Sequence, residues 1–127
     1  MQRARLPSFE DQDHLGYANP PIRPVLLYLR GRIKALGRMG EKVTPNKRIA
    51  YDVERDFCEV KVQRERILVR VFNMGVSDPK GIVTDIPRSH QWVYQKEIPI
   101  DSKELVDYAI PFIEASYRSS RAREPRR

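Results

Sequence analysis

Residues 48–73 hold three short segments in which apolar and polar side chains alternate, and this run constrains the fold more than any other feature. The segments read RIAYDV, DFCEVKVQ and RILVRVFN, and short charged turns separate them. Alternation with a period of two is typical of strands that bury one face of a sheet and expose the other. Because turns this short join neighbouring strands, the three segments predict an antiparallel meander.

An amphipathic helix is predicted on each side of this strand region. Residues 22–36 place apolar side chains at helical spacing, and Pro24 suits the first turn, where its missing N–H costs nothing. Residues 101–117 form the second helix, with Asp101 as its expected N-terminal cap. Pro111 lies inside that helix and removes one of its hydrogen bonds, so we expect a kink there or two shorter helices.

These elements predict an α+β fold, a two-layer sandwich of an N-terminal helix, an antiparallel meander of about four to five strands and a C-terminal helix with an internal proline. The additional strand is expected in WVYQKEIPI, whereas EKVTPNK is interpreted as a loop. We expect residues 21–118 to form the single domain. Residues 1–20 are interpreted as a flexible arm or linker, and residues 119–127 as a basic disordered tail.

The length and composition narrow the class of protein further. With 127 residues, 40% of them hydrophobic and 32% charged, the chain suits one small globular domain. It has no apolar run near the roughly 20 residues that span a membrane, and its first residues lack the apolar core of a secretion signal. Cys58 is the single cysteine, so an internal disulfide is excluded. These features predict a cytoplasmic protein that does not associate with membranes.

Positive charge is concentrated in two parts of the chain. The net charge is +7, yet residues 22–48 alone carry eight Lys or Arg against Glu41, and residues 118–127 carry five Arg against Glu124. A clustered excess of this kind can bind a polyanion such as nucleic acid, although it can also be a solvated helix face and tail. The residues expected to contact phosphates are Arg30, Arg32, Lys34, Arg38, Lys42, Lys47 and Arg48.

Catalytic and metal-binding patterns are sparse. The chain has no glycine-rich phosphate loop, no paired Cys or His at metal spacing and no nucleophile elbow, so we expect neither a cofactor nor a metal. The strongest catalytic candidate is the acidic group around the first hairpin, which could hold a divalent metal for phosphodiester cleavage. The alternative is that these acids occupy a turn, where acids are common. The group comprises Asp52, Glu54, Asp56 and Glu59, with Lys61 nearby.

The segment DPKGIVTDIPRSHQW, residues 78–92, is a long connection between two predicted strands. Its first four residues favour a turn, because proline fixes φ and glycine tolerates positive φ. Long loops often carry function, so Lys80, Asp85, His90 and Trp92 form a possible site for a ligand or a partner. The alternative is a structural loop that a buried Trp92 anchors to the sheet.

Residues 47–117 resemble a family of uncharacterised bacterial and archaeal domains that are often labelled predicted transport proteins. The resemblance rests on KRIAYDVERDFCEVKVQRERILVRV, on DPKGIVTDI with Trp92, and on ELVDYAIPFIEASY. Members of this family often form the C-terminal part of proteins with restriction-type or other defence-related nuclease domains. The resemblance therefore implies an accessory domain, with no established catalytic residues to transfer to this chain.

Together these observations predict a small, non-catalytic accessory domain that associates with nucleic acid or with a nuclease-type protein. Two alternatives stay open at this point. One is an enzyme, a metal-dependent hydrolase or nuclease that uses the acidic hairpin or the loop around His90. The other is a self-association module, in which an edge of the sheet or the first helix forms an interface between copies.

Overall fold

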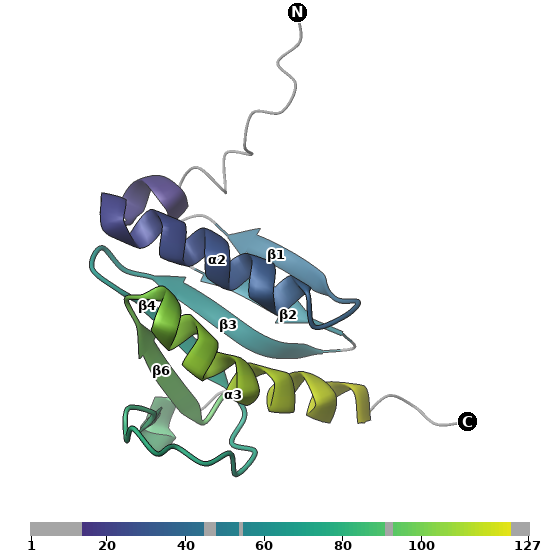
Figure 1. The fold of residues 1–127 in the computed structure, drawn as a ribbon. Coiled ribbons are helices and arrows are strands. Elements are labelled where there is room, and N and C mark those ends of the chain that lie inside the picture. The colour runs from purple at the N-terminus through teal and green to yellow at the C-terminus, as the bar shows by residue number, and fades with distance from the viewer. Residues whose placement is uncertain (1–13, 45–47, 54, 91–92, 123–127) are drawn as a thin grey trace, which may run out of the picture.

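The structure is a computed structural model that describes residues 14–44, 48–53, 55–90 and 93–122. In chain order the elements are η1 (Pro20–Ile22), α2 (Arg23–Lys34), β1 (Gly40–Thr44), β2 (Arg48–Asp52), β3 (Asp56–Val62), β4 (Ile67–Val71), β5 (Thr84–Asp85), η2 (Arg88–His90), β6 (Lys96–Ile100) and α3 (Lys103–Ala122). The strands form one six-stranded antiparallel sheet in the order β1-β2-β3-β4-β6-β5. Helices α2 and α3 lie side by side over the same face of this sheet (Figure 1). The predicted two-layer α+β fold is confirmed, with one or two strands more than expected.

The core lies between the helices and one face of the sheet. Four directly opposed residues, Ile49, Val60, Val69 and Ile98, form a row across β2, β3, β4 and β6, and each is fully buried. Complete burial of such an aliphatic side chain contributes about 1.5–3 kcal/mol. The neighbouring row faces away from the helices and is polar apart from the buried Ala50, so we call this side of the sheet the open face. The open-face row comprises Ala50, Glu59, Arg70, Glu97 and Thr84.

A β-bulge interrupts the pairing of β2 with β3. Tyr51 lies opposite Cys58, whereas Asp52 lies opposite Asp56, so Phe57 is the extra residue. Phe57 is fully buried and contacts Tyr117 of α3 edge to face, with ring centroids 5.2 Å apart. A bulge bends its strand and re-aims a side chain. Here it adds an aromatic ring to the contact between the sheet and α3.

The segment EKVTPNK was expected to be a loop, and that prediction is wrong for its first half, because β1 covers residues 40–44. Glu41 and Val43 of β1 lie opposite Tyr51 and Ile49 of β2, so an acidic residue occupies a position that faces the helices. Because Glu41 occupies a core-facing position, residues 40–44 lack the alternation of apolar and polar side chains by which a strand is predicted from sequence. Partners from other elements satisfy this carboxylate, as described below.

Helix α3 differs from its prediction at two points. It runs without interruption from residue 103 to residue 122, so Pro111 does not divide it. Pro111 itself is exposed, while its neighbours Ile110 and Phe112 are buried against the rest of the domain. The cap is Ser102 rather than Asp101, because the Ser102 hydroxyl accepts a hydrogen bond from the backbone N–H of Leu105 at 3.2 Å. Burial of one face of α3 therefore outweighs the hydrogen bond lost at Pro111.

The packed unit extends beyond the boundaries expected from sequence. Residues 14–17 form a helical turn in which His14 is buried, and its Nε2 donates to the carbonyl oxygen of Thr44 at 2.7 Å. Ala18 is part of the core, and the backbone N–H of Asn19 donates to the carbonyl of Arg64 at 2.9 Å. The chain from residue 14 onward therefore belongs to the fold, and residues 119–122 belong to α3.

Candidate functional site

Two of the basic residues predicted to contact phosphates converge on a carboxylate within the domain. Arg30 and Lys34 lie on α2, with Arg30 Nε 3.1 Å and Lys34 Nζ 3.6 Å from the carboxylate of Glu41. Tyr51 on β2 donates its hydroxyl hydrogen to the same carboxylate at 2.6 Å. These contacts join α2 to the edge strand β1. Arg30 and Lys34 are therefore partly committed to holding the fold together.

The electrostatics of this cluster follow from its surroundings. Burial acts to raise the pKa of Glu41, but the hydrogen bonds from Arg30 and Tyr51 and the charges of Arg30 and Lys34 outweigh burial, so the pKa lies below its ordinary value. Burial, and then the hydrogen bond to Glu41, raise the pKa of Tyr51 far above its ordinary value. Glu41 is thus charged and Tyr51 neutral around pH 7, which suits a structural cluster.

Arg32 lies at the seam between the two helices. Its guanidinium contacts the carboxylate of Asp107 on α3 and donates to the Tyr28 hydroxyl at 3.2 Å. Tyr28 in turn donates to Asp107 at 2.6 Å. Arg32 keeps a solvent-exposed part, yet its charge is balanced by Asp107. It therefore adds little net positive charge to the outer surface of α2.

Arg48 belongs to a line of ion pairs that crosses the open face. Arg48 Nε is 3.4 Å from Glu59, whose other carboxylate oxygen is 2.9 Å from Arg70, and Arg70 Nε is 2.8 Å from Glu97. Glu59, Arg70 and Glu97 lie directly opposite one another on β3, β4 and β6, so the strand register itself creates these contacts. Arg48 and Lys42 are thus on the opposite side of the sheet from Arg30 and Lys34.

This arrangement also bears on the acidic hairpin. Glu59 forms ion pairs with two arginines. Asp52 and Asp56 are opposed in the register of β2 and β3, beside the bulge. Glu54 lies outside the described residues. Within the part of the chain that the structure describes, no three His, Cys, Asp or Glu side chains group as metal ligands. Among the described hairpin acids, Asp52, Asp56 and Glu59 therefore do not gather into a group of metal ligands.

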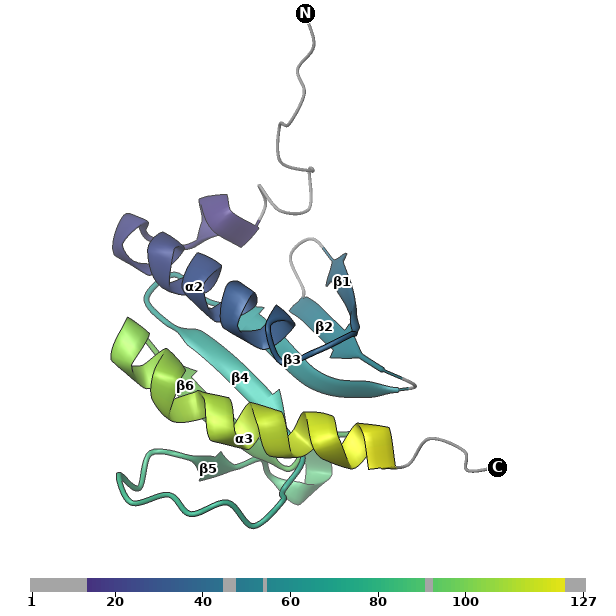
Figure 2. The same cartoon turned by 45° about the vertical axis from the view of Figure 1, so that its right-hand side comes forward.

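Helices α2 and α3 terminate at the same end of the domain (Figure 2), and the backbone of two arginines lies beside the last turns of α3 there. The Tyr117 hydroxyl of α3 donates to the carbonyl oxygen of Arg38 at 3.3 Å, and the Ser120 hydroxyl donates to the carbonyl of Arg55 at 3.5 Å. These contacts place the α2–β1 connection and the β2–β3 turn beside the last turns of α3. Arg118 lies there too and pairs with Glu114 at 2.7 Å. We call Arg38, Arg55 and Arg118 the arginine end.

The long loop is fastened to α3 by its first turn. The carboxylate of Asp78 accepts hydrogen bonds from the Tyr108 hydroxyl and from the backbone N–H groups of Ile82 and Val83, at 3.3 and 3.0 Å for the two backbone donors. The hydrogen bond from Tyr108 is the main cause that lowers the pKa of Asp78 below its ordinary value. Gly81 adopts a φ of 65°, which favours glycine. DPKG is thus a structural turn.

Of the four residues proposed for the loop site, the structure describes the side chains of Lys80 and Asp85 only, and these contact different elements. Lys80 lies over the Tyr108 ring, 5.6 Å from its centroid. Asp85, on β5, pairs with Lys96 of β6. His90 ends η2, but its side chain lies outside the described residues, as do Trp92 and the basic residue Lys47. The predicted burial of Trp92 therefore stays a prediction.

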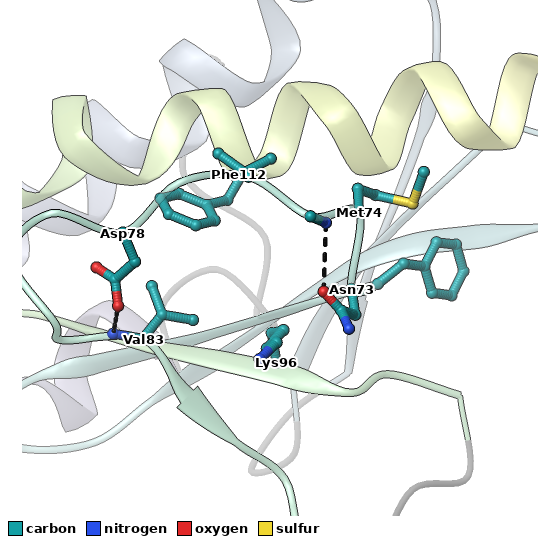
Figure 3. Close-up of a pocket in the computed structure, with 9 residues that line it drawn as sticks. Asn73, Met74, Asp78, Val83, Lys96 and Phe112 are labelled. Carbon is teal, nitrogen blue, oxygen red and sulfur yellow. Dashed lines mark hydrogen bonds between the residues drawn. The ribbon is translucent and has the colours of Figure 1, made fainter.

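A pocket of about 260 Å³ lies between the start of the long loop, β6 and α3 (Figure 3). Figure 3 shows Phe112 reaching in from α3, with Asp78 and Val83 on one side and Asn73 and Met74 on the other. Sequence reasoning missed this pocket because its residues come from segments far apart in the chain. The lining residues are Phe72, Asn73, Met74, Gly75, Val76, Asp78, Val83, Lys96 and Phe112.

Comparison with protein families, with curated proteins and with solved structures gives no significant match. The resemblance to the domains labelled predicted transport proteins stays a prediction. Among the described residues no helix has the length and apolar character needed to cross a membrane. A functional assignment therefore rests on the geometry and charge of this chain alone.

Proposed function

We propose that this protein is a non-catalytic accessory domain that binds the phosphate backbone of nucleic acid through the arginine end. The observation that supports the proposal is the convergence of Arg38 and Arg55, from two separate connections, on the last turns of α3. Arg121 lies in the last turn of α3, and Arg123, Arg126 and Arg127 follow α3 in the sequence. Segments that are distant in sequence thus bring arginines to one end of the domain.

Arg38 and Arg55 of the arginine end are better placed to bind phosphate than the arginines of α2, whereas Arg118 already pairs with Glu114. Arg30 and Arg32 are balanced by Glu41 and Asp107, and a phosphate would have to compete with these carboxylates. Among the described residues, by contrast, no carboxylate lies within ion-pair distance of Arg38 or Arg55. Both residues are exposed. An arginine without a carboxylate partner offers its full set of N–H donors to phosphate oxygens.

Binding of this kind should be indifferent to sequence and sensitive to salt. Contacts to phosphates position a protein on nucleic acid but read no bases. Each phosphate contact on duplex DNA adds about 0.9 to the slope of log affinity against log salt concentration, because it releases condensed counterions. A domain that uses only a few arginines should therefore bind weakly, and its binding should vanish as salt rises.

The test is fluorescence anisotropy of labelled duplex and single-stranded oligonucleotides, measured over a series of salt concentrations. We expect Arg38→Gln/Arg55→Gln to lower the salt slope by up to about two. The matched control is Arg64→Gln/Arg66→Gln, which removes the same charge from the β3–β4 turn at the opposite end of β3. Truncation of the chain after Ala122 should further lower the slope of log affinity against log salt concentration, and the truncated chain keeps the whole of α3.

Two results would overturn the proposal. One is an equal loss of slope in the two double variants, which would mean that net charge alone attracts the oligonucleotide. The other is a lack of binding by the intact protein to either oligonucleotide at low salt. In that case the arginine end is a solvated surface, and a nuclease-type protein becomes the better candidate for the partner.

A further inference from the structure

The pocket beside α3 has walls that are already in place. Val83 is held by its backbone N–H, which donates to Asp78, and Asp78 is held in turn by Tyr108 of α3. At the other side, the backbone N–H of Asn73 donates to the side chain of Gln95 at 3.0 Å. The loop is therefore tied to the helix at one end of the pocket and to the segment before β6 at the other. A pocket with pre-formed walls binds a ligand without a large ordering cost.

Apolar side chains provide about half of the lining, and polar groups provide the rest. Phe72, Val76, Val83 and Phe112 contribute apolar surface, and Met74 adds a flexible side chain that is 44% exposed. A volume near 260 Å³ suits a small ligand rather than a nucleotide, since a cavity of about 150 Å³ accommodates benzene. The walls therefore select a compact apolar body, such as one aromatic ring or a branched aliphatic chain.

The polar groups of the lining differ in how much hydrogen-bonding capacity they have left. Both carboxylate oxygens of Asp78 already accept hydrogen bonds from Tyr108, Ile82 and Val83. Asn73 uses its carbonyl oxygen to accept from the backbone N–H of Gly75 at 3.3 Å, which leaves its two amide N–H donors. Lys96 has three donors, and the structure gives it one acceptor, Asp85. The side-chain capacity that remains toward a ligand therefore lies mainly with donors, one of them a cation.

The ion pair between Asp85 and Lys96 is weak. Its side chain is 77% exposed, and an ion pair open to water contributes little because water and salt screen it. Asp85 also approaches from β5, at the edge of the sheet, and does not line the pocket. A carboxylate that entered the pocket could take its place on Lys96 while the apolar body of the ligand gained burial.

We propose that this pocket binds a small monocarboxylate with an apolar body, whose carboxylate contacts Lys96 and Asn73 and whose body lies against Phe72, Val83 and Phe112. Asp85 acts as a competitor from within the chain, because it holds Lys96 when the pocket is empty. Lys96 should therefore increase the affinity for the ligand, and its ion-pair partner Asp85 should decrease it. This proposal uses none of the residues of the arginine end, so either proposal can fail without the other.

The test is a titration of the isotopically labelled full chain with phenylacetate and with 4-methylpentanoate, followed by backbone amide chemical shifts. We expect saturable shifts confined to residues 72–83 and to residues around Lys96. The uncharged phenylacetamide should bind more weakly by about tenfold, which corresponds to about 1.4 kcal/mol. Lys96→Met should weaken phenylacetate binding to a similar degree, whereas Asp85→Asn should strengthen it by removing the competitor.

Matched variants separate binding from folding. Lys61→Met removes a lysine from the open face of β3 and should leave phenylacetate binding unchanged. Val83→Phe keeps the backbone hydrogen bond to Asp78 but fills the pocket, so it should abolish binding while the spectrum of the folded domain persists. The proposal is overturned if neither carboxylate gives saturable shifts at millimolar concentration, if the amide binds equally well, or if Asp85→Asn and Lys96→Met change the affinity in the same direction.

Discussion

Tyr108 on α3 donates its hydroxyl hydrogen to Asp78 and accepts a hydrogen bond from the backbone N–H of Lys80 at 3.0 Å. One phenolic oxygen therefore fixes both sides of the turn that begins the long loop. Burial, and then the hydrogen bond to Asp78, raise the pKa of Tyr108, so it stays a neutral donor at ordinary pH. We therefore expect this contact to hold the pocket wall at Val83 in one position.

The first prediction concerns this turn. Tyr108→Phe should broaden or double the amide resonances of Ile82 and Val83 and speed their hydrogen exchange, because Asp78 then lacks its fixed partner. Acid should act similarly on the wild type. The pKa of Asp78 is lowered in the fold, so its carboxylate is fully charged at neutral pH and is protonated only as pH falls through that lowered value. Changes in these two resonances near the ordinary pKa of an aspartate, or none in Tyr108→Phe, would contradict this account.

The second prediction concerns Glu41, the partly buried carboxylate of β1. Glu41→Gln should lower the free energy of unfolding by about 1–3 kcal/mol at pH 7, because Arg30 and Lys34 lose their charged acceptor. The folded-state pKa of Glu41 is below its ordinary value, so its contribution is present above the unfolded pKa and is lost as pH falls through the folded pKa. Urea denaturation at several pH values should therefore show a smaller acid dependence in Glu41→Gln. Glu65→Gln, in the exposed β3–β4 turn, is the control and should behave as wild type.

The third prediction concerns the contact between Gly37 and α3. A Cβ atom at Gly37 would lie 2.2 Å from the Tyr117 hydroxyl oxygen, so Gly37→Ala should destabilise the domain by about 1–3 kcal/mol. Part of this cost should disappear in the Tyr117→Phe background, and a double-mutant cycle measures the difference. Gly31 offers the opposite case, because its Cβ would meet nothing within 4 Å on the exposed side of α2. Gly31→Ala should stabilise the domain by about 0.5–1 kcal/mol, and a loss there would refute this view of the two glycines.

The fourth prediction concerns Ser116, a fully buried polar residue of α3. Its hydroxyl donates to the carbonyl oxygen of Phe57 at 2.6 Å and accepts from the backbone N–H of Phe72 at 3.2 Å. Ser116→Ala should lower the free energy of unfolding by about 1–3 kcal/mol, because two backbone groups then each lose a buried hydrogen bond. Ser119→Ala changes the same side chain one turn later, at a position that is partly exposed, and should cost much less in thermal or urea denaturation. Equal costs would show that Ser116 acts through helix propensity alone.

The alternation of apolar and polar residues predicted the central strands of the sheet well, but it missed the edge strand β1 and the bulge. The apolar side chains of β3 and β4 alternate clearly, so period-two reasoning located both strands. β1 was missed because Glu41 occupies a core-facing position, and the partner that makes this tolerable, Arg30, comes from another element. The bulge at Phe57 left no signal in the alternation, since it depends on how β2 and β3 pair.

The candidate sites show the same division between local and tertiary information. Sequence located the excess of basic residues, but it could not show that Arg32 meets Asp107 or that Arg48 meets Glu59, since these contacts join distant elements. The convergence of Arg38 with Arg55 depends on the end of α3 in the same way. Asn73, Lys96 and Phe112 are unremarkable residues individually, and only the fold gathers them around one pocket.

The strand order has a consequence for how the chain folds. β1, β2, β3 and β4 are neighbours in both sequence and space, so each of their pairings closes only a short connection and costs little chain entropy. The pairing of β4 with β6 must instead close residues 72–95, and α2 meets α3 only after the whole sheet has been traversed. We therefore expect the first four strands to form the folding nucleus, with β6 and α3 joining later. Both ends of α3 would then reach their places in the last step of folding, after the sheet beneath them has formed.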